Sequence, residues 1–143
     1  MRCDEILQHE VTFVRPGDHV HVAATKMREA NIGFLPVCEE DSTVVGVLTD
    51  RDLAMRIVAD QWSGATPVRD VMTTEGLVTC RPDDELEVAA DLMREHQVER
   101  VVITDEEDRL LGVVSLADVV HYASEDKIAE AMRDVTDREV TPS

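Results

Sequence analysis

The sequence contains few aromatic residues, few basic residues and no long apolar run. Aromatic side chains make up 3% of the 143 residues, which removes the stacking platforms of proteins that bind single-stranded nucleic acid. Fourteen Lys and Arg against 31 Asp and Glu give a net charge of −17, which repels polyanions, so nucleic acid is not expected as a partner. No segment approaches the roughly 18 apolar residues of a membrane span, and the acidic start of the chain lacks the apolar region of a signal peptide. We therefore expect a cytoplasmic location and no membrane partner.

Cysteine is also scarce, and its pattern predicts neither a metal site nor a disulfide framework. Cys3, Cys38 and Cys80 show no Cys-x-x-Cys or zinc spacing, and an odd number in a cytosolic chain favours buried or free thiols. A redox- or metal-responsive role for Cys38 and Cys80 stays open as an alternative. No Ser/His/Asp or Cys/His arrangement and no glycine-rich phosphate loop is present, so the sequence does not predict an enzyme.

The chain is a tandem duplication. Gly112 stands 66 positions after Gly46, and the same offset carries Arg15-Pro16 onto Arg81-Pro82. From residue 15 to residue 52 the offset holds without insertion or deletion, and 13 of these 38 aligned positions are identical. Self-similarity at a fixed period indicates a repeated structural unit. We expect a first repeat with its leader at 1–62, a second repeat with its linker at 63–124, and a C-terminal helix and tail at 125–143.

Each repeat is predicted to fold as β-α-β-β-α, which places the protein in the α+β class. β-Branched and apolar runs predict strands, and apolar residues at i, i+3, i+4 and i+7 predict amphipathic helices. The expected strands lie at 11–14, 34–37, 44–48, 101–103 and 110–114, and the expected helices at 20–27, 51–60, 86–93 and 116–123.

Acidic residues mark the predicted helix starts. Asp18 and Asp84 are expected N-caps of the first helix in each repeat, and Glu87 would complete a capping box in the second. The leader at 1–10 resembles the later linker, because the offset of 66 aligns Asp4 with Asp70.

Two copies of one short pattern carry the chemistry. Gly46-Val47-Leu48-Thr49-Asp50-Arg51-Asp52 and Gly112-Val113-Val114-Ser115-Leu116-Ala117-Asp118 each place a hydroxyl at a predicted helix start and an aspartate three residues later. The free N–H groups of the first turn suit phosphate, and the carboxylate of Asp52 or Asp118 can accept both hydroxyls of a ribose. A capping box that serves only the helix is the alternative for one copy. Two copies in register favour binding.

The whole duplication resembles a pair of CBS domains, named after cystathionine beta-synthase. The resemblance rests on the two Gly-to-Asp patterns, on the two alanines ahead of Met-Arg-Glu in each repeat, and on the lead-in Val68-Arg69-Asp70-Val71-Met72-Thr73. It covers roughly residues 4 to 124. It implies two repeats packed through their sheets around a pseudo-two-fold axis, with clefts between them that bind AMP, ADP, ATP or S-adenosylmethionine in family members.

The resemblance also implies roles for individual residues. Asp52 and Asp118 would hold ribose hydroxyls, with Thr49 and Ser115 beside them. Arg51 and Arg100 would reach phosphates. The middle strands would line the adenine through Phe34, Leu35, Val101 and Val102. The two clefts should differ, because Phe34 occupies the position of Arg100 and Ala117 occupies the position of Arg51.

The sequence thus predicts a regulatory module that senses adenine nucleotides by binding, needs no cofactor, forms a homodimer and reports to an unidentified protein partner. The apolar faces at 20–27 and 86–93 could supply the dimer interface or belong to the core. The alternative function is a ligand-free dimerisation or interaction module with empty clefts.

Overall fold

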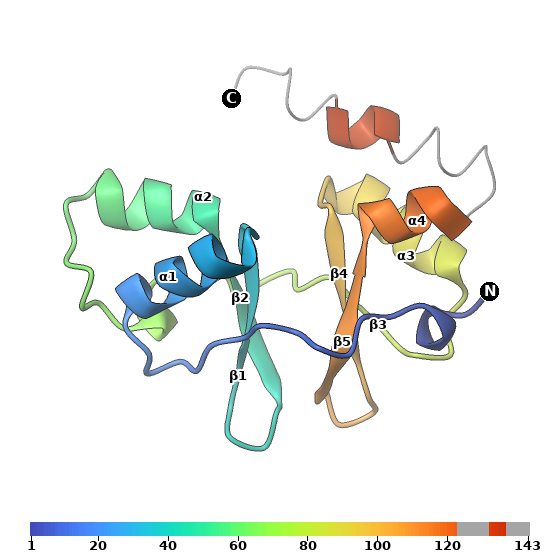
Figure 1. The fold of residues 1–143 in the computed structure, drawn as a ribbon, viewed down its shortest axis with the longest axis horizontal. Coiled ribbons are helices and arrows are strands. Elements are labelled where there is room, and N and C mark those ends of the chain that lie inside the picture. The colour runs from blue at the N-terminus through green and yellow to red at the C-terminus, as the bar shows by residue number, and fades with distance from the viewer. Residues whose placement is uncertain (123–131, 137–143) are drawn as a thin grey trace. The chain divides into compact units, whose positions relative to one another are not determined.

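The computed structural model describes residues 1–122 and 132–136, which form two compact units (Figure 1). We call the first the first-repeat unit; it comprises Thr12–Leu77 and Asp108–Leu110. The second-repeat unit comprises Met1–Val11, Val78–Glu107 and the described residues from Leu111 onward. The leader therefore folds with the second repeat, and the linker folds with the first.

A short antiparallel hairpin forms the centre of the first-repeat unit. Strand β1 (Phe34–Cys38) pairs with β2 (Val44–Thr49), and Phe34 stands opposite Thr49. On one side of the hairpin Val14 bridges to Val37 in the parallel sense. On the other side the linker adds an antiparallel bridge from Thr73 to Val47. The sheet is thus completed by one residue from each flanking segment.

The helices of the first-repeat unit cover this sheet with apolar faces. Helix α1 (Val20–Ala30) buries Val20, Ala23 and Met27 in a core with Leu35 and Leu48. It ends at Asn31, which adopts the left-handed conformation typical of helix C-termini (φ 54°). After β2 the chain forms α2 (Asp50–Asp52), the π-helical segment η2 (Leu53–Val58) and then the short 3₁₀ helix η3 (Val68–Asp70).

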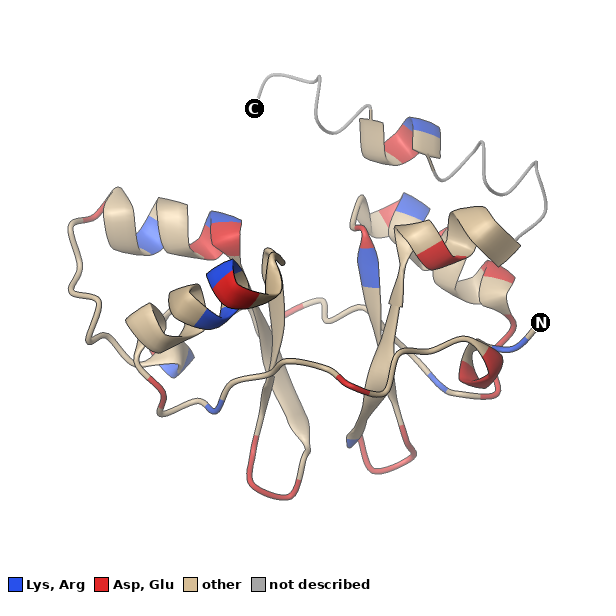
Figure 2. Ribbon diagram, in the orientation of Figure 1, with Lys and Arg blue, Asp and Glu red and all other residues tan. Residues whose placement is uncertain are grey.

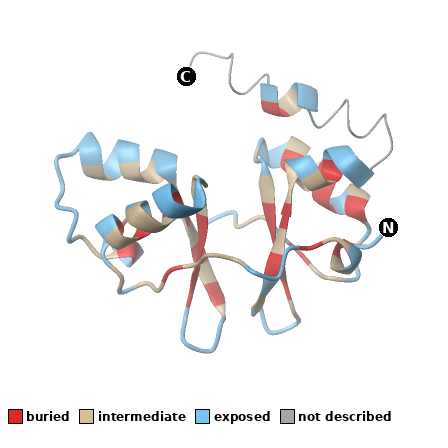
Figure 3. Cartoon of the chain, in the orientation of Figure 1, coloured by how far each residue is buried: buried red, intermediate tan, exposed pale blue. Residues whose placement is uncertain are grey.

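The second-repeat unit has the same plan. A three-stranded sheet in the order β3-β4-β5 is built from Thr79–Cys80, Arg100–Thr104 and Leu110–Ser115. Its helices are η1 (Cys3–Glu5), α3 (Leu86–His96) and α4 (Leu116–Tyr122). The leader bridges to the sheet through Gln8 and Val113. Figure 3 shows the buried residues on the strands and on one face of the helices.

The α+β class and the duplicated β-α-β-β-α order are confirmed, and two details of the sequence prediction are corrected. The N–H of Cys3 donates to the carbonyl oxygen of Asp84 (2.9 Å), and the N–H of Val68 donates to the carbonyl oxygen of Asp18 (2.8 Å). Because Asp84 is the equivalent of Asp18 in the second repeat, Cys3 is the equivalent of Val68, and the leader aligns with the linker at an offset of 65. Asp70 therefore corresponds to Glu5 instead of Asp4. The predicted strand at 11–14 is reduced to the single bridge at Val14.

The predicted N-caps of the first helices are wrong. The N-caps of α1 and α3 are His19 and Glu85, each one residue after the predicted cap, and neither side chain accepts a hydrogen bond from the N–H groups of its own helix. The carboxylates of Asp18 and Asp84 instead accept the N–H groups of Arg15 and Arg81 (both 2.9 Å). These aspartates close the turn before the helix, a local use that competes with capping.

The apolar faces at 20–27 and 86–93 lie in the two cores, which settles the choice left open between core and interface. The predicted C-terminal helix at 125–134 falls largely on residues 123–131, outside the described part of the chain. Residues 132–136 are helical, and Val135 is buried. Within residues 1–122 and 132–136 no helix has the length and apolarity needed to cross a membrane.

Candidate ligand-binding site

The end of β2 carries a complete capping box. The Thr49 hydroxyl accepts the N–H of Asp52 (3.1 Å), and the Asp52 carboxylate accepts the N–H of Thr49 (3.0 Å). Each side chain satisfies a backbone donor that the start of a helix leaves free. The N–H of Asp50 donates to Gly33 (2.9 Å), which ties the helix start to the beginning of β1.

The end of β5 carries the same device. The Ser115 hydroxyl accepts the N–H of Asp118 (3.2 Å), and the Asp118 carboxylate accepts the N–H of Ser115 (2.9 Å) and its hydroxyl (3.0 Å). The N–H of Leu116 donates to Glu99 (2.8 Å), so β4 also begins beside the helix start. The predicted N-caps Thr49 and Ser115 are confirmed.

The glycine of each pattern leaves room for a segment that packs across its strand: the linker crosses β2 at Gly46, and the leader crosses β5 at Gly112. A Cβ on Gly46 would lie 2.9 Å from the Met72 sulfur and from the Thr73 carbonyl oxygen. A Cβ on Gly112 would lie 2.5 Å from the Gln8 carbonyl oxygen and would overlap Leu7. Both distances are shorter than van der Waals contact. Any side chain larger than glycine at residue 46 or 112 would therefore displace the linker or the leader.

The two aspartates differ in the donors that reach their carboxylate oxygens. The Thr73 hydroxyl donates to both carboxylate oxygens of Asp52 (3.3 Å each). The residue at the corresponding leader position is Gln8, which pairs with Val113 as Thr73 pairs with Val47. Among the described residues no donor reaches Oδ1 of Asp118. Asp118 therefore keeps one oxygen for an external donor.

The middle strands bring the remaining predicted residues beside these boxes, but mostly with buried side chains. Leu35 and Val101 pack inside their own cores, and Val102 is buried as well. Phe34 and Arg100, at the first positions of β1 and β4, are partly exposed. Leu35, Val101 and Val102 can therefore contribute backbone groups to a ligand, while Phe34 and Arg100 can also contribute side chains.

The two arginines predicted to reach phosphates lie near the two boxes. Arg51 is exposed in the first turn of α2, and Arg100 opens β4. Within the described residues neither guanidinium forms an ion pair or a hydrogen bond. Elsewhere acidic residues dominate, and Figure 2 shows them at both hairpin turns.

Sequence reasoning missed the role of the duplicated Arg15 and Arg81. The Arg15 guanidinium donates to the carbonyl oxygens of Cys38 (3.3 Å) and Glu39. The Arg81 guanidinium donates to the Thr104 hydroxyl (2.7 Å) and to the Asp105 carbonyl oxygen. Each arginine thus holds its own hairpin, and the identity of these positions in the two repeats was the signal available in the sequence.

The three cysteines are free and buried, as the sequence predicted. Burial raises the pKa of the Cys38 thiol to about 11, although the Arg15 charge acts in the opposite direction. Cys38 and Cys80 belong to different units, and Cys80 contacts Cys3 instead. The described residues contain no group of three or more His, Cys, Asp and Glu side chains that could hold a metal ion.

Comparison with known proteins identifies the family. The CBS domain family matches residues 3–59 and 68–125. The chain is 37% identical to the CBS domain-containing protein YhcV of Bacillus subtilis over 132 residues, 92% of each chain. Two solved structures are also similar: Hypoxic Response Protein I with two coordinated zinc ions (30% identity, TM-score 0.77, 87% of this chain and 100% of that chain), and CBSX2 in complex with AMP (27%, 0.73, 85% and 95%). The chain belongs to the CBS-domain family and carries the domain as a tandem pair.

Proposed function

We propose that this CBS pair is a regulatory module that binds adenosine-containing nucleotides, with AMP as the first candidate and ADP, ATP and S-adenosylmethionine as further ones. The observation that carries this proposal is the pair of formed boxes, Thr49 with Asp52 and Ser115 with Asp118, each at the end of a strand beside a partly exposed residue. The AMP complex of the similar protein CBSX2 supports the choice of ligand.

In this proposal each side chain has a defined task. Asp52 and Asp118 accept ribose hydroxyls, because a carboxylate can accept two donors at once. The Thr49 hydroxyl donates beside Asp52, and the Ser115 hydroxyl, which already donates to Asp118, lies beside the ribose as an acceptor. Arg51 and Arg100 bind phosphate oxygens. The side chain of Phe34 and the backbone groups of Leu35, Val101 and Val102 contact the adenine.

The free oxygen of Asp118 makes the second-repeat unit the stronger candidate. A ribose that binds Asp52 must displace the Thr73 hydroxyl, whereas Oδ1 of Asp118 needs no such exchange. Arg100 belongs to the same unit as Asp118. A monophosphate with one ribose therefore suits Ser115, Asp118 and Arg100 together.

The module acts by binding instead of catalysis. A ligand that prefers one conformation of the chain shifts the population toward it, and the affinity for a protein partner follows by linkage. We place the protein in the cytoplasm, where these nucleotides are available, and we propose no required cofactor.

Thermal unfolding with AMP, ADP, ATP, S-adenosylmethionine, NADH and GMP tests the proposal. A ligand at about 100 times its dissociation constant stabilises the fold by roughly 2.7 kcal/mol, a shift of several degrees in Tm. The Asp52→Ala/Asp118→Ala double variant should lose the shift, and the hairpin variant Glu106→Ala, which removes an exposed carboxylate, should keep it. The absence of any shift, with calorimetry in agreement, would leave the ligand-free interaction module as the function.

We also propose a homodimer, with the helical segment after β2 as its contact surface. Met55, Val58 and Trp62 are 58%, 74% and 46% exposed, and large exposed apolar side chains that lie together mark interaction sites. Val58→Glu should shift the mass measured by light scattering from dimer to monomer, while Val88→Glu on α3 should not. A monomeric wild type would refute the dimer, and the nucleotide proposal would be unaffected.

A further inference from the structure

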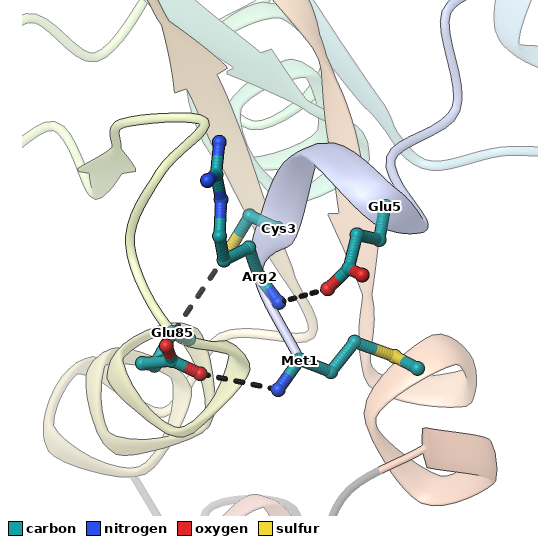
Figure 4. Close-up of polar contacts among 5 residues, drawn as sticks. All are labelled: Met1, Arg2, Cys3, Glu5 and Glu85. Atoms are coloured by element: carbon teal, nitrogen blue, oxygen red, sulfur yellow. Dashed lines mark hydrogen bonds and ion pairs between the residues drawn. The ribbon is translucent and has the colours of Figure 1, made fainter.

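The leader and the sheet of the second-repeat unit bring two thiols together. Cys3 lies in η1 and Cys80 ends β3; they are 0% and 3% exposed and belong to the same core. The two thiols lie close enough that each affects the ionisation of the other. The sulfur of Cys3 also lies 4.0 Å from the carbonyl oxygen of Glu85 (Figure 4).

The backbone fixes this juxtaposition. The N–H of Cys3 donates to Asp84 (2.9 Å) and that of Asp4 donates to Pro82 (2.8 Å), so the leader lies along the turn that follows Cys80. At the start of η1 the N–H of Arg2 donates to the Glu5 carboxylate (2.6 Å; Figure 4). These backbone bonds thus hold the segment of Cys3 against the segment that follows Cys80.

The first-repeat unit shows what the same position requires for packing alone. Its equivalents of Cys3 and Cys80 are Val68 and Val14, both fully buried in the corresponding core. Val68 makes the backbone bond to Asp18 that Cys3 makes to Asp84. Two apolar side chains therefore fill this site without any thiol, and the pair of cysteines adds a chemical capability.

We propose that Cys3 and Cys80 form a reversible disulfide when the protein meets a low-molecular-weight disulfide such as oxidised glutathione, and that this bond staples the leader to β3. The bond needs sulfurs about 2.05 Å apart, and both side chains lie in the same core on segments that the backbone joins. This modification is independent of nucleotide binding.

The exchange balances in two steps. The Cys3 thiolate attacks one sulfur of oxidised glutathione, which forms a mixed disulfide and releases one glutathione thiolate. The Cys80 thiolate then attacks the Cys3 sulfur and releases the second. The two protons of the cysteines end on two glutathione thiols, and the two electrons pass to the glutathione sulfurs. Because both cysteines are buried, the reaction proceeds through local opening of the leader.

The electrostatics of the pair agree with this order of attack. The hydrogen bond from Cys80 stabilises the Cys3 thiolate and lowers the pKa of Cys3, whereas the same bond and burial raise the pKa of Cys80. Once Cys3 is in the mixed disulfide it no longer carries the negative charge that disfavours the Cys80 thiolate.

Equilibration of the full chain in glutathione redox buffers tests the proposal, with the equilibrium approached from reduced and from oxidised protein. Trypsin should yield one disulfide-linked pair of peptides, residues 3–26 with residues 70–94, and intact mass should fall by about 2 Da. Closing a loop of this length should raise Tm by about 10 °C. The Cys38→Ser control should behave as wild type.

The variant Cys3→Val/Cys80→Val, copied from the other unit, should fold, show no linked peptides and have the same Tm in both buffers. Persistence of both free thiols from both starting states, or linkage of either cysteine to Cys38, would overturn the proposal. So would a linked pair with no rise in Tm, since the staple would then not hold the leader.

Discussion

The first-repeat and second-repeat units place the same capping box at the end of the same strand but surround its aspartate differently. Asp52 is held by the Thr73 hydroxyl, whereas Asp118 keeps one oxygen free of donors from the described residues. The cores differ in a similar way, with Val14 and Val68 in one and Cys80 and Cys3 in the other. Both contrasts lie where the leader or the linker meets its sheet.

Several positions that are identical in the two repeats serve the fold. Arg15 and Arg81 hold hairpins, Asp18 and Asp84 close turns, and each pattern glycine lies under a crossing segment. Identity at these positions therefore reports the fold. The following predictions test the contrasts between the two units.

The largest effect is expected at the glycines. Gly112→Ala places a Cβ 2.5 Å from a backbone oxygen, and the leader must move, so the free energy of unfolding in urea should fall by about 3 kcal/mol. Gly46→Ala should cost less, about 2 kcal/mol, because its nearest contacts are longer at 2.9 Å. Gly17→Ala, with its nearest atom at 3.5 Å, is the control and should change little. Equal losses in all three variants would refute the crossing-segment explanation.

The aspartates should differ in ligand affinity. Asp118→Ala should weaken AMP binding by about 30-fold, because hydrogen bonds to a charged group contribute roughly 1.5–3 kcal/mol. Asp52→Ala should weaken it by less than about threefold, since this would change the energy by under about 0.7 kcal/mol. Both variants lose a capping box, so calorimetry should be done well below their Tm. Similar losses in both would show that the Thr73 contact does not distinguish the sites.

Alkaline pH should destabilise the first-repeat unit through Cys38, whose counterpart in the other repeat is Thr104. The folded-state pKa of about 11 exceeds the unfolded value of about 9, so the folded state binds more protons between these values and loses stability as pH rises. At pH 10 wild type should lose about 1.4 kcal/mol relative to Cys38→Ser. Urea midpoints at pH 7 and pH 10 measure the difference. A parallel response of both proteins would contradict the prediction.

The smallest effect is expected at Thr73. Thr73→Val removes the hydroxyl that donates to Asp52 and should strengthen binding at that site by a few-fold, at a cost in stability of about 0.5–1 kcal/mol. Gln8→Thr introduces the hydroxyl beside Asp118 and should weaken binding by a similar factor. Calorimetry measures the AMP affinity of both variants, one of which removes the hydroxyl beside its aspartate while the other introduces it. Changes in the same direction would argue against Thr73 as the origin of the asymmetry.

The repeat, the strands, the helices and the boxes at Thr49 and Ser115 could be predicted from the sequence because they depend on local patterns. Periodicity set the amphipathic helices, and the hydroxyl-to-aspartate spacing set the caps. The prediction of Asp18 and Asp84 as N-caps was wrong because these carboxylates accept the backbone N–H of Arg15 and Arg81 in the turn before each helix. The use of Leu35, Val101 and Val102 as ligand contacts stays a prediction, and their burial limits it to the backbone.

By itself the sequence determined the duplication, the α+β plan and the position of each candidate aspartate, since these follow from spacing along the chain. Tertiary structure decided that the leader folds with the second repeat, that Thr73 reaches Asp52, and that Cys3 meets Cys80. These contacts join residues 21 to 77 positions apart. No local pattern encodes them, because they arise only when a crossing segment packs on a sheet formed elsewhere in the chain.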